Sequence, residues 1–202
     1  MTQKPSPTLD FWYEFASPYS YPVAMRIDAL AKASNVTVNW KPFLLGPVFS
    51  AQGWQDSPFN LYPAKGAYMW RDMERICQQQ GIPFQRPQIF PARSVLAAKV
   101  AMIGASDGWI APYSRAVYTA VFALDMDIFR PETIRSILAD LDLNAAQILD
   151  RAQTGEGAHL RQQTEGAIKR GIFGAPSFTV GAELFWGGDR LQSAINWALD
   201  ST

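Results

Sequence analysis

Cysteine and histidine are almost absent from this chain. Its 202 residues contain one cysteine, Cys77, and one histidine, His159. A single cysteine excludes an internal disulfide, and without a cluster of cysteine and histidine the sequence offers no metal site. No pattern ties His159 to a nucleophilic serine, which argues against a Ser-His-Asp hydrolase. A P-loop and a dinucleotide fingerprint are also missing from the sequence.

Net charge and long apolar runs are lacking as well. The 18 basic and 18 acidic residues cancel. Nucleic acids and anionic membranes both favour a basic surface, so neither is expected as a partner. No apolar stretch reaches the ~18 residues that span a bilayer, and residues 1–7 lack the apolar core of a signal peptide. With the lone cysteine, these features predict a soluble cytoplasmic protein.

Hydrophobic residues, by contrast, make up 48% of the chain and aromatic residues 13%, which is enough for a large core. Apolar side chains alternate over residues 9–15, which predicts a buried first strand. Helical patterning follows from about residue 18 to 33, and residues 36–43 read as a second strand. A strand, a helix and a strand at this spacing form a βαβ unit with parallel strands.

The middle of the chain has a different character. Residues 44–64 are rich in glycine, proline and aromatics without a clear period, which predicts a long loop. No strand signal is present from about residue 46 to 170. Helical patterns cover residues 65–80, 93–105, 110–125, 131–141 and 144–153.

Alternating structure returns at the end of the chain. The pattern predicts a helix over about 157–170, strands over 177–180 and 183–186, and a helix over about 189–199. The complete order predicts an α/β protein, namely a thioredoxin-like fold with a helical insertion domain. We assign residues 1–45 and 167–202 to the thioredoxin-like domain and residues 46–166 to the insertion.

Two short segments carry the candidate chemistry. Ser17 stands where the first strand gives way to helical patterning, so it can cap that helix, with Pro18 as the first helical residue. Gly174-Ala175-Pro176 stands between a helix and a strand, and we expect the peptide bond before Pro176 to be cis. A cis-proline exposes the backbone groups of the preceding residue, Ala175, to an extended ligand. The plain alternatives are a simple helix cap and an ordinary loop proline.

Three segments together resemble the 2-hydroxychromene-2-carboxylate isomerase family: Ser17-Pro18-Tyr19-Ser20-Tyr21, Phe173-Gly174-Ala175-Pro176 and Phe185-Trp186-Gly187-Gly188-Asp189-Arg190-Leu191. That family is grouped with kappa-class glutathione transferases and with the disulfide oxidoreductase DsbA. The resemblance runs in order from about residue 9 to 200. Redox members carry Cys-x-x-Cys where this chain has Ser-Pro-Tyr-Ser, so a reactive sulfur must come from a bound molecule.

The resemblance implies that this molecule is glutathione, with its thiolate held at Ser17 as the catalytic residue. A helix N-terminus lowers the pKa of a thiol, and the serine hydroxyl can donate a hydrogen bond to the sulfur anion. Ala175 and Pro176 are the implied partners of the peptide backbone. Gly188 and Asp189 are implied at the γ-glutamyl end, where Gly188 offers only its backbone. Capping the last helix is an equally good role for Asp189.

The long loop supplies further implied contacts. Asn60 and the backbone of Pro63 are candidate glutathione contacts, and Trp54 is an alternative to Asn60. Lys65 is a candidate partner of the glycyl carboxylate, although a solvated lysine is as good an interpretation. The second substrate would be a small aromatic carboxylate, for which Arg71 and Arg93 are candidate partners, although a solvated surface position is the more common role of such arginines. Its pocket would draw on Phe15, Tyr19, Trp54, Phe59, Tyr62 and Trp70, most of which can equally be core.

The function that the resemblance implies is a glutathione-dependent isomerase of aromatic degradation. Thiolate addition turns a double bond into a single bond, the bond rotates, and the thiolate leaves. Two alternatives remain: a kappa-like transferase or peroxidase, and a non-redox binding module that takes a peptide at Ala175. Glutathione affinity separates the module from the enzymes, and turnover without glutathione consumption separates the two enzymes. A homodimer is compatible with the family, and the sequence does not test it.

Overall fold

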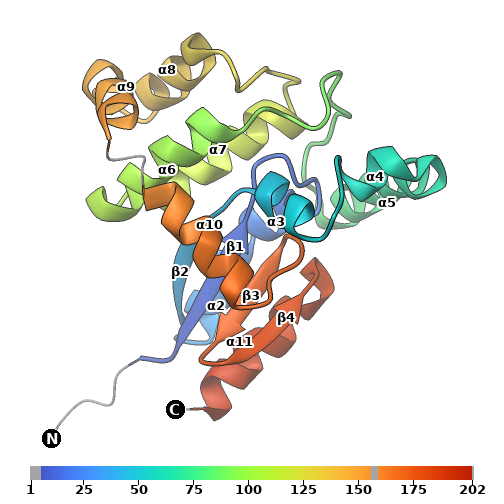
Figure 1. Ribbon diagram of the computed structural model, residues 1–202. Coiled ribbons are helices and arrows are strands. Elements are labelled where there is room, and N and C mark those ends of the chain that lie inside the picture. Colours follow the sequence, from blue (N-terminus) through green and yellow to red (C-terminus); the bar gives the residue numbers. More distant parts are fainter. Residues whose placement is uncertain (1–5, 156–158, 202) are drawn as a thin grey trace, which may run out of the picture.

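A four-stranded sheet in the order β2-β1-β3-β4 is the centre of the fold (Figure 1). The computed structural model describes residues 6–155 and 159–201. Strand β1 (Thr8–Tyr13) pairs in parallel with β2 (Thr37–Pro42) and antiparallel with β3 (Ser177–Val180). Strand β3 pairs antiparallel with β4 (Glu183–Trp186). The two ends of the chain therefore build one sheet, as the sequence predicts.

One face of the sheet carries the larger core. Phe11 of β1 lies there, with its ring stacked on that of Tyr13 at 5.1 Å between centroids. Helices α2 (Ile27–Ala33) and α11 (Leu191–Asp200) cover this face. An aromatic pair adds about 0.5–1.5 kcal/mol to what its buried area contributes. Packing of these rings therefore fixes the position of β1 and of the turn that follows it.

The opposite face is covered by two other helices. Trp12 points to it because successive side chains of a strand alternate between faces. There Trp12 packs with Val48 of α3 (Leu45–Ala51) and with Ala167 of α10 (His159–Lys169). Its indole N–H donates to Thr179 Oγ1 at 3.0 Å, which satisfies the buried polar atom. In Figure 1, α10 accordingly crosses in front of the sheet.

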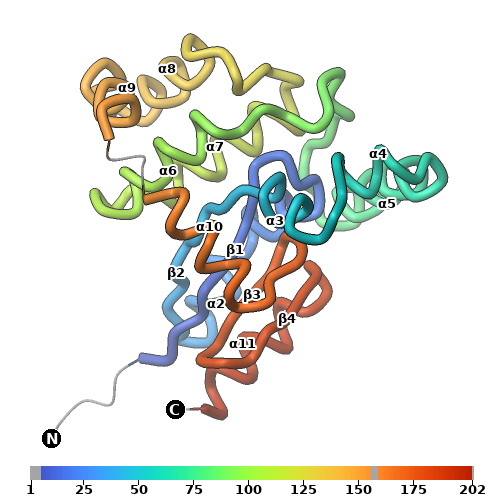
Figure 2. The backbone as a smooth tube through the Cα atoms, in the orientation of Figure 1, coloured from blue at the N-terminus to red at the C-terminus, as the bar shows by residue number. Residues whose placement is uncertain are grey.

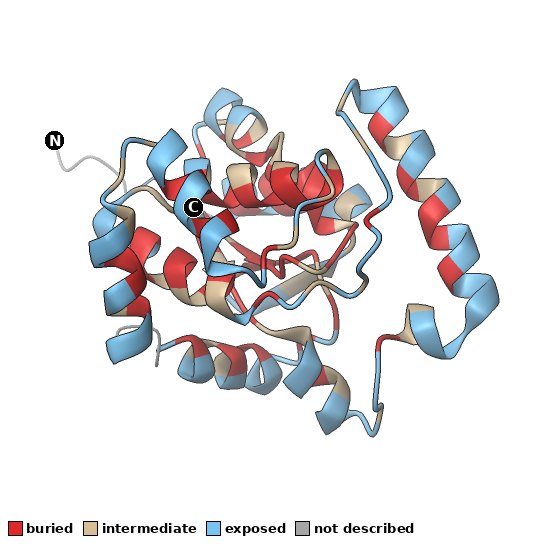
Figure 3. Cartoon of the chain, turned by 90° about the horizontal axis from the view of Figure 1, so that it is seen from above, coloured by how far each residue is buried: buried red, intermediate tan, exposed pale blue. Residues whose placement is uncertain are grey.

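Most of the predicted insertion forms a helical layer beyond the carboxyl end of β1 (Figure 2). Tyr13 at that end shares a 2.6 Å hydrogen bond with Ser114, which ties the layer to the sheet. The buried positions of the long helix α5 form one stripe, and its other side is exposed (Figure 3). The helices of the layer are α5 (Pro63–Gln80), α6 (Val95–Asp107), α7 (Ile110–Phe122), α8 (Pro131–Asp140) and α9 (Ala145–Thr154).

Two stretches differ from the prediction. The helix expected over 18–33 is two helices, α1 (Ser20–Ala24) and α2, because the chain bends at Arg26, whose φ is −124°. The long loop expected over 44–64 contains α3 and α4 (Pro58–Leu61). Helix α4 begins where the Ser57 hydroxyl accepts a hydrogen bond from the Phe59 N–H and Pro58 takes the first helical position.

The late helices are shifted slightly from their predicted bounds. The expected start of the helix over 157–170 lies outside the described residues, and α10 is described from His159 onward. The domain boundary predicted between residues 166 and 167 falls inside α10. Among the residues that the structure describes, no helix combines the length and apolar character needed to traverse a bilayer.

Candidate active site

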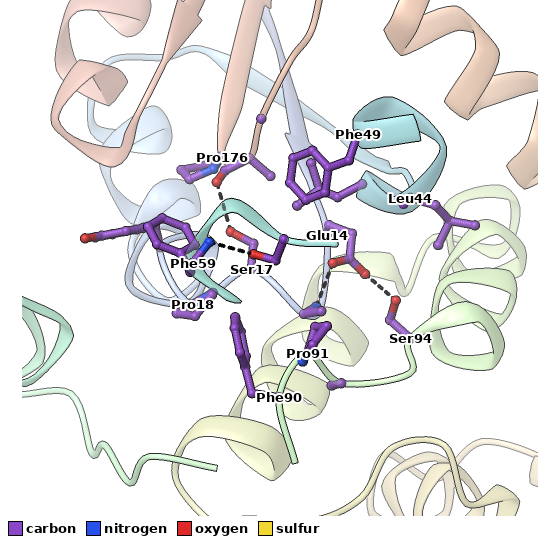
Figure 4. A pocket seen from close by; sticks show the side chains of 18 of the residues that line it. Glu14, Ser17, Pro18, Leu44, Phe49, Phe59, Phe90, Pro91, Ser94 and Pro176 are labelled. Carbon is purple, nitrogen blue, oxygen red and sulfur yellow. Dashed lines mark hydrogen bonds between the residues drawn. The ribbon is translucent and has the colours of Figure 1, made fainter. Parts of the chain in front are cut away.

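Ser17 lies in the turn that follows β1, and only 5% of it is exposed. Its N–H donates to the Glu14 carbonyl at 2.9 Å, and its carbonyl accepts from the Ser20 N–H at 3.1 Å. Its hydroxyl donates to the Ala175 carbonyl at 2.9 Å (Figure 4). Three hydrogen bonds thus fix Ser17 in the wall of the site and aim its side chain at the segment before Pro176.

The structure corrects the expected helix cap. Helix α1 begins at Ser20 behind Tyr19, and no side chain caps it. The Ser17 hydroxyl is engaged by Ala175, and residues 18–21 form a tight turn in which the Tyr21 N–H donates to the Pro18 carbonyl at 3.1 Å. A helix of five residues adds little dipole. Any stabilisation of an anion here therefore rests on the hydroxyl more than on the helix.

The Ala175–Pro176 peptide bond is cis. The segment around it is fixed on two sides, because the Gly187 N–H donates to the Pro176 carbonyl at 3.0 Å and the Ser177 hydroxyl donates to the Gly174 carbonyl at 2.8 Å. The Ala175 carbonyl accepts from Ser17, whereas its N–H has no hydrogen bond among the described residues. One backbone donor of Ala175 is therefore available to a ligand.

Trp186 and Gly174 pack so closely that only glycine fits before Ala175. A Cβ atom on Gly174 would lie 2.6 Å from Trp186 Nε1, far inside van der Waals contact. The Trp186 ring also stacks at a tilt on Phe173, with 5.0 Å between centroids. Strand β4 therefore holds the cis-proline segment in place through one aromatic side chain.

A cavity of about 1520 Å³ opens beside Ser17. Ligand pockets commonly measure roughly 300–1,000 Å³, so this cavity has room for two small molecules side by side. It runs from the turn before α11, past Ser17, to the start of α6 and the end of α9. Figure 4 shows Ser17 and Pro176 toward one side of the cavity and Glu14 and Ser94 toward the other.

Most of the residues predicted to bind glutathione line this cavity. They are Ser17, Lys65, Ala175, Pro176, Gly188 and Asp189. Asn60 and Pro63 are not among its lining residues. The Asn60 amide donates to both carboxylate oxygens of Asp56, at 3.1 and 3.2 Å, and so is held within its own turn. Of the two alternative loop residues, Trp54 lines the cavity and Asn60 does not.

The turn before α11 differs from the predicted cap. Asp189 does not cap α11, because a 3₁₀ turn, Gly188–Arg190, precedes that helix and Arg190 is its N-cap residue. Gly187 enters this turn with a φ of +105°, a conformation that favours glycine. Arg26 Nη2 donates to the Gly188 carbonyl at 3.0 Å and anchors the turn to the bend between α1 and α2. The exposed Asp189 carboxylate lies 3.5 Å from Arg190 Nε, and a surface ion pair of this kind is weak enough for a ligand ammonium to compete with it.

Lys65 stands in the first turn of α5, at the cavity's edge. Its ammonium lies 4.8 Å from the centre of the Tyr62 ring, a cation–π contact worth about 0.5–1 kcal/mol at an exposed site. Such a contact is weak enough for a carboxylate to compete with it. Lys65 and Asp189 thus place one charge of each sign on the cavity's surface.

Glu14 is a site residue that the sequence did not reveal. It is 4% exposed and lines the cavity. Its Oε2 accepts from the Ala16 N–H at 3.0 Å, and its Oε1 accepts from the Ser94 hydroxyl. Burial raises the pKa of Glu14 to about 7, against the smaller lowering effect of these two hydrogen bonds. The sequence feature that could have revealed it is an acidic residue within an apolar run, between Tyr13 and Phe15.

The part of the cavity near α6 is lined by apolar side chains and by two cationic ones. Arg93 and Lys99 line it, whereas Arg71 pairs with Glu74 at 2.6 Å and does not. Of the six aromatic candidates, Tyr19, Trp54 and Phe59 line the cavity, and Phe15, Tyr62 and Trp70 are not among its lining residues. Cys77 lies buried in α5, where burial raises its pKa to about 11 and keeps the thiol protonated.

Comparison with known proteins identifies the family. The family model of the DsbA-like thioredoxin domain matches residues 8–195, almost the whole chain. The chain belongs to the DsbA-like thioredoxin family. Within this family, its Ser17 stands in the turn after β1, across from a cis-proline at Pro176.

Three relatives of this DsbA-like protein match over nearly their full length. The 2-hydroxychromene-2-carboxylate isomerase of Sphingobium xenophagum is 26% identical over 195 residues, covering 96% of this chain and 98% of the relative. Human glutathione S-transferase kappa 1 is 23% identical over 200 residues, covering 92% and 88%. A solved structure of 2-hydroxychromene-2-carboxylate isomerase has a TM-score of 0.85 at 25% identity, covering 96% of this chain and 97% of that one. The predicted family and fold are thereby confirmed.

Proposed function

We propose that this protein is a glutathione-dependent isomerase of the 2-hydroxychromene-2-carboxylate type, acting in aromatic degradation. The observation that carries the proposal is the Ser17 hydroxyl, which faces the cis Ala175–Pro176 peptide at the wall of a cavity large enough for two molecules. The site has a hydrogen-bond donor for a thiolate and no thiol of its own, since Cys77 is buried elsewhere. The relatives named isomerase and kappa transferase support this proposal.

Glutathione would lie along the Ala175 edge with its sulfur at Ser17. The free Ala175 N–H would donate to the cysteinyl backbone, as in an added strand. Asp189 would accept from the γ-glutamyl ammonium, and Lys65 would meet the glycyl carboxylate. The Ser17 hydroxyl now donates to the Ala175 carbonyl, so it must rotate to donate to the sulfur. A hydrogen bond to a charged group is worth about 1.5–3 kcal/mol, which favours the thiolate over the thiol.

The second substrate would occupy the part of the cavity between Ser17 and α6. Arg93 and Lys99 there can attract its carboxylate, and Phe49 and Phe90 offer apolar surface for its ring. The thiolate adds to an unsaturated carbon, the former double bond rotates as a single bond, and expulsion of the thiolate restores the double bond. Atoms and electrons balance without an oxidant, and glutathione is recovered.

Turnover and thiol titration together test the proposal. The protein is incubated with 2-hydroxychromene-2-carboxylate and a much smaller amount of glutathione. We expect substrate conversion to exceed the glutathione present many times over, while the thiol titre stays constant. Ser50→Ala, which changes a cavity serine on α3, is the matched control and should keep its activity.

Two other outcomes would contradict the proposal. Loss of one thiol for each substrate molecule converted indicates a kappa-like transferase, and loss of two thiols for each hydroperoxide reduced indicates a kappa-like peroxidase. The relationship to human kappa 1 favours this second candidate. Failure of glutathione to bind indicates a non-redox binding module. Because the proposed cofactor is reduced glutathione, we also propose a cytoplasmic location, which cell fractionation tests.

A further inference from the structure

Glu14 is a buried acid for which the steps above provide no use. It sits in the same turn as Ser17, since the Ser17 N–H donates to the Glu14 carbonyl at 2.9 Å. Glu14 and Ser17 line the same cavity, and Figure 4 shows both side chains there. Buried carboxylates are costly, so one placed at the wall of a ligand cavity calls for an explanation.

No cation neutralises Glu14 within the described part of the chain. Its carboxyl oxygens accept from the Ala16 N–H and the Ser94 hydroxyl, both uncharged. From α7, the Tyr118 hydroxyl donates to the Glu14 carbonyl at 2.9 Å. On the wall formed by α6 and the segment before it, Lys99 and Arg93 line the cavity, and the Arg93 guanidinium lies over the Phe129 ring at 5.1 Å. Neither forms an ion pair with Glu14.

A thiolate at Ser17 would bring a second negative charge into this region. Two like charges in a poorly solvated site repel, and the repulsion is relieved when one of them takes up a proton. A thiol that binds as a thiolate releases a proton at the same moment. The acid nearest in the chain to Ser17 and lining the same cavity is Glu14.

We infer that Glu14 takes up the proton that the thiol loses when a small thiol binds at Ser17, an inference that rests on the proposed function. The S–H bond breaks, an O–H bond forms on the Glu14 carboxyl group, and the net charge of the site does not change. Glu14 is in this sense the proton acceptor of the site, and Ser17 is the donor to the sulfur.

The hydrogen bonds around Glu14 suit both of its protonation states. As a carboxylate it accepts from Ala16 and Ser94. As a neutral acid, its carbonyl oxygen can still accept from the Ala16 N–H, while its new O–H can donate to the Ser94 hydroxyl, which both donates and accepts. Proton uptake therefore leaves no buried polar group without a partner. The pKa of Glu14, about 7 in the free protein, places the change near neutral pH.

The number of protons exchanged on binding tests the inference. Glutathione is titrated into the protein by calorimetry at about pH 7.5 in buffers of different ionisation enthalpy, which gives the protons released for each molecule bound. Absorbance of the thiolate is measured in parallel. A thiol with a pKa of about 8.5 is about nine-tenths protonated at this pH, so formation of a thiolate alone releases about 0.9 proton.

The wild type should release well under half a proton, because Glu14 retains most of it. Glu14→Gln keeps the shape and both hydrogen bonds but cannot titrate, so it should release close to the full amount. Its thiolate should form at the same or a lower pH than in the wild type, because no neighbouring carboxylate repels it. Glu14→Asp, which keeps a titratable carboxyl, should return toward the wild-type count. Asp72→Asn, which removes another cavity carboxylate while retaining an acceptor for Tyr19, is the matched control and should behave as the wild type.

The outcomes separate this inference from the proposed function. Thiolate absorbance with the same proton release in wild type and Glu14→Gln would overturn the role of Glu14 and leave the function standing. Binding without thiolate, or no binding in either protein, would overturn the proposed function itself. A folded Glu14→Gln protein, checked by circular dichroism, is required for the comparison. If that variant does not fold, Ser94→Ala provides a second test: loss of this hydrogen bond raises the pKa of Glu14 and leaves less of it ionised before binding, so this variant should release more protons at about pH 7.5 than the wild type, and an unchanged release would overturn the inference.

Discussion

The Ser17 hydroxyl donates to the carbonyl of Ala175, 158 residues further along the chain, at 2.9 Å. This bond joins the turn after β1 to the cis-proline segment before β3 and closes the wall of the cavity. Each partner carries one group that a thiol ligand needs: the Ser17 hydroxyl for the sulfur and the Ala175 N–H for the peptide. The bond between them therefore positions both groups before a ligand arrives.

Ser17→Ala should weaken thiolate formation more than it weakens glutathione binding. Loss of one hydrogen bond to a charged group costs about 1.5–3 kcal/mol, so the pKa of the bound thiol should rise by roughly one to two units. Spectroscopic titration of the bound thiol measures this shift, with Ser50→Ala as control. An unchanged pKa would make Ser17 a purely structural residue, and loss of all binding would make it a ligand anchor instead.

Dithiol–disulfide exchange should be absent, in contrast to redox members of the fold. The chain has only Cys77, which is buried and whose pKa burial raises to about 11. A thiol of that kind is neither accessible nor ionised at neutral pH. An insulin-reduction assay should show no turnover above that of a Cys77→Ser control. Turnover that exceeds this control would contradict the prediction.

Gly174→Ala should destabilise the protein by about 1–3 kcal/mol, the usual cost of overpacking. The new methyl group would meet Trp186 Nε1 at 2.6 Å and push the segment before Pro176 out of place. Chemical denaturation measures the loss, and Gly46→Ala, where a Cβ meets nothing within 4 Å, is the control. Adding Trp186→Leu should recover part of the stability. A double variant no more stable than Gly174→Ala alone would argue against the clash.

Local sequence patterns predicted the strands and most helices of this fold well. The alternation along residues 9–15 and the Gly-Ala-Pro segment are short-range signals, and the strands and the candidate site around Pro176 follow from them. The Ser17 cap was wrong because a distant carbonyl engages its hydroxyl. The break at Arg26 and the turn at Gly188 are joined by a hydrogen bond between residues 162 positions apart, which no local pattern shows.

The chemistry of Glu14 likewise could not be predicted from local sequence. Its burial and its titration near neutral pH depend on Ser94, 80 residues away at the start of α6, and on how the insertion closes over β1. No local pattern carries that information. Asn60, predicted to contact glutathione, does not line the cavity, because its amide donates to the neighbouring Asp56 carboxylate.

The pH dependence of stability should reveal Glu14 in the free protein. Its pKa is about 7 in the folded chain against an ordinary value of 4.5, so the folded state binds the proton more tightly than the unfolded state does. Below pH 4.5 the Glu14 carboxyl is protonated in the folded and in the unfolded state, so the folded state has no buried charge and stability carries no penalty for one. Between pH 4.5 and about 7 the cost of burying its charge grows, and above about 7 the cost is complete. Stability is therefore lost as the pH rises through this window.

Glu14→Gln isolates this effect because every other group titrates in both proteins. The free energy of unfolding of the variant, relative to the wild type, should increase across the window by up to about 3 kcal/mol and then level off. Ser94→Ala removes a hydrogen bond that lowers the pKa of Glu14 in the folded protein, so the upper end of the window should move to higher pH in that variant. Denaturation at a series of pH values measures both. A difference between Glu14→Gln and wild type that is constant from acidic to neutral pH would mean that the Glu14 carboxyl keeps its ordinary pKa, and the acceptor role inferred for it would lose its basis.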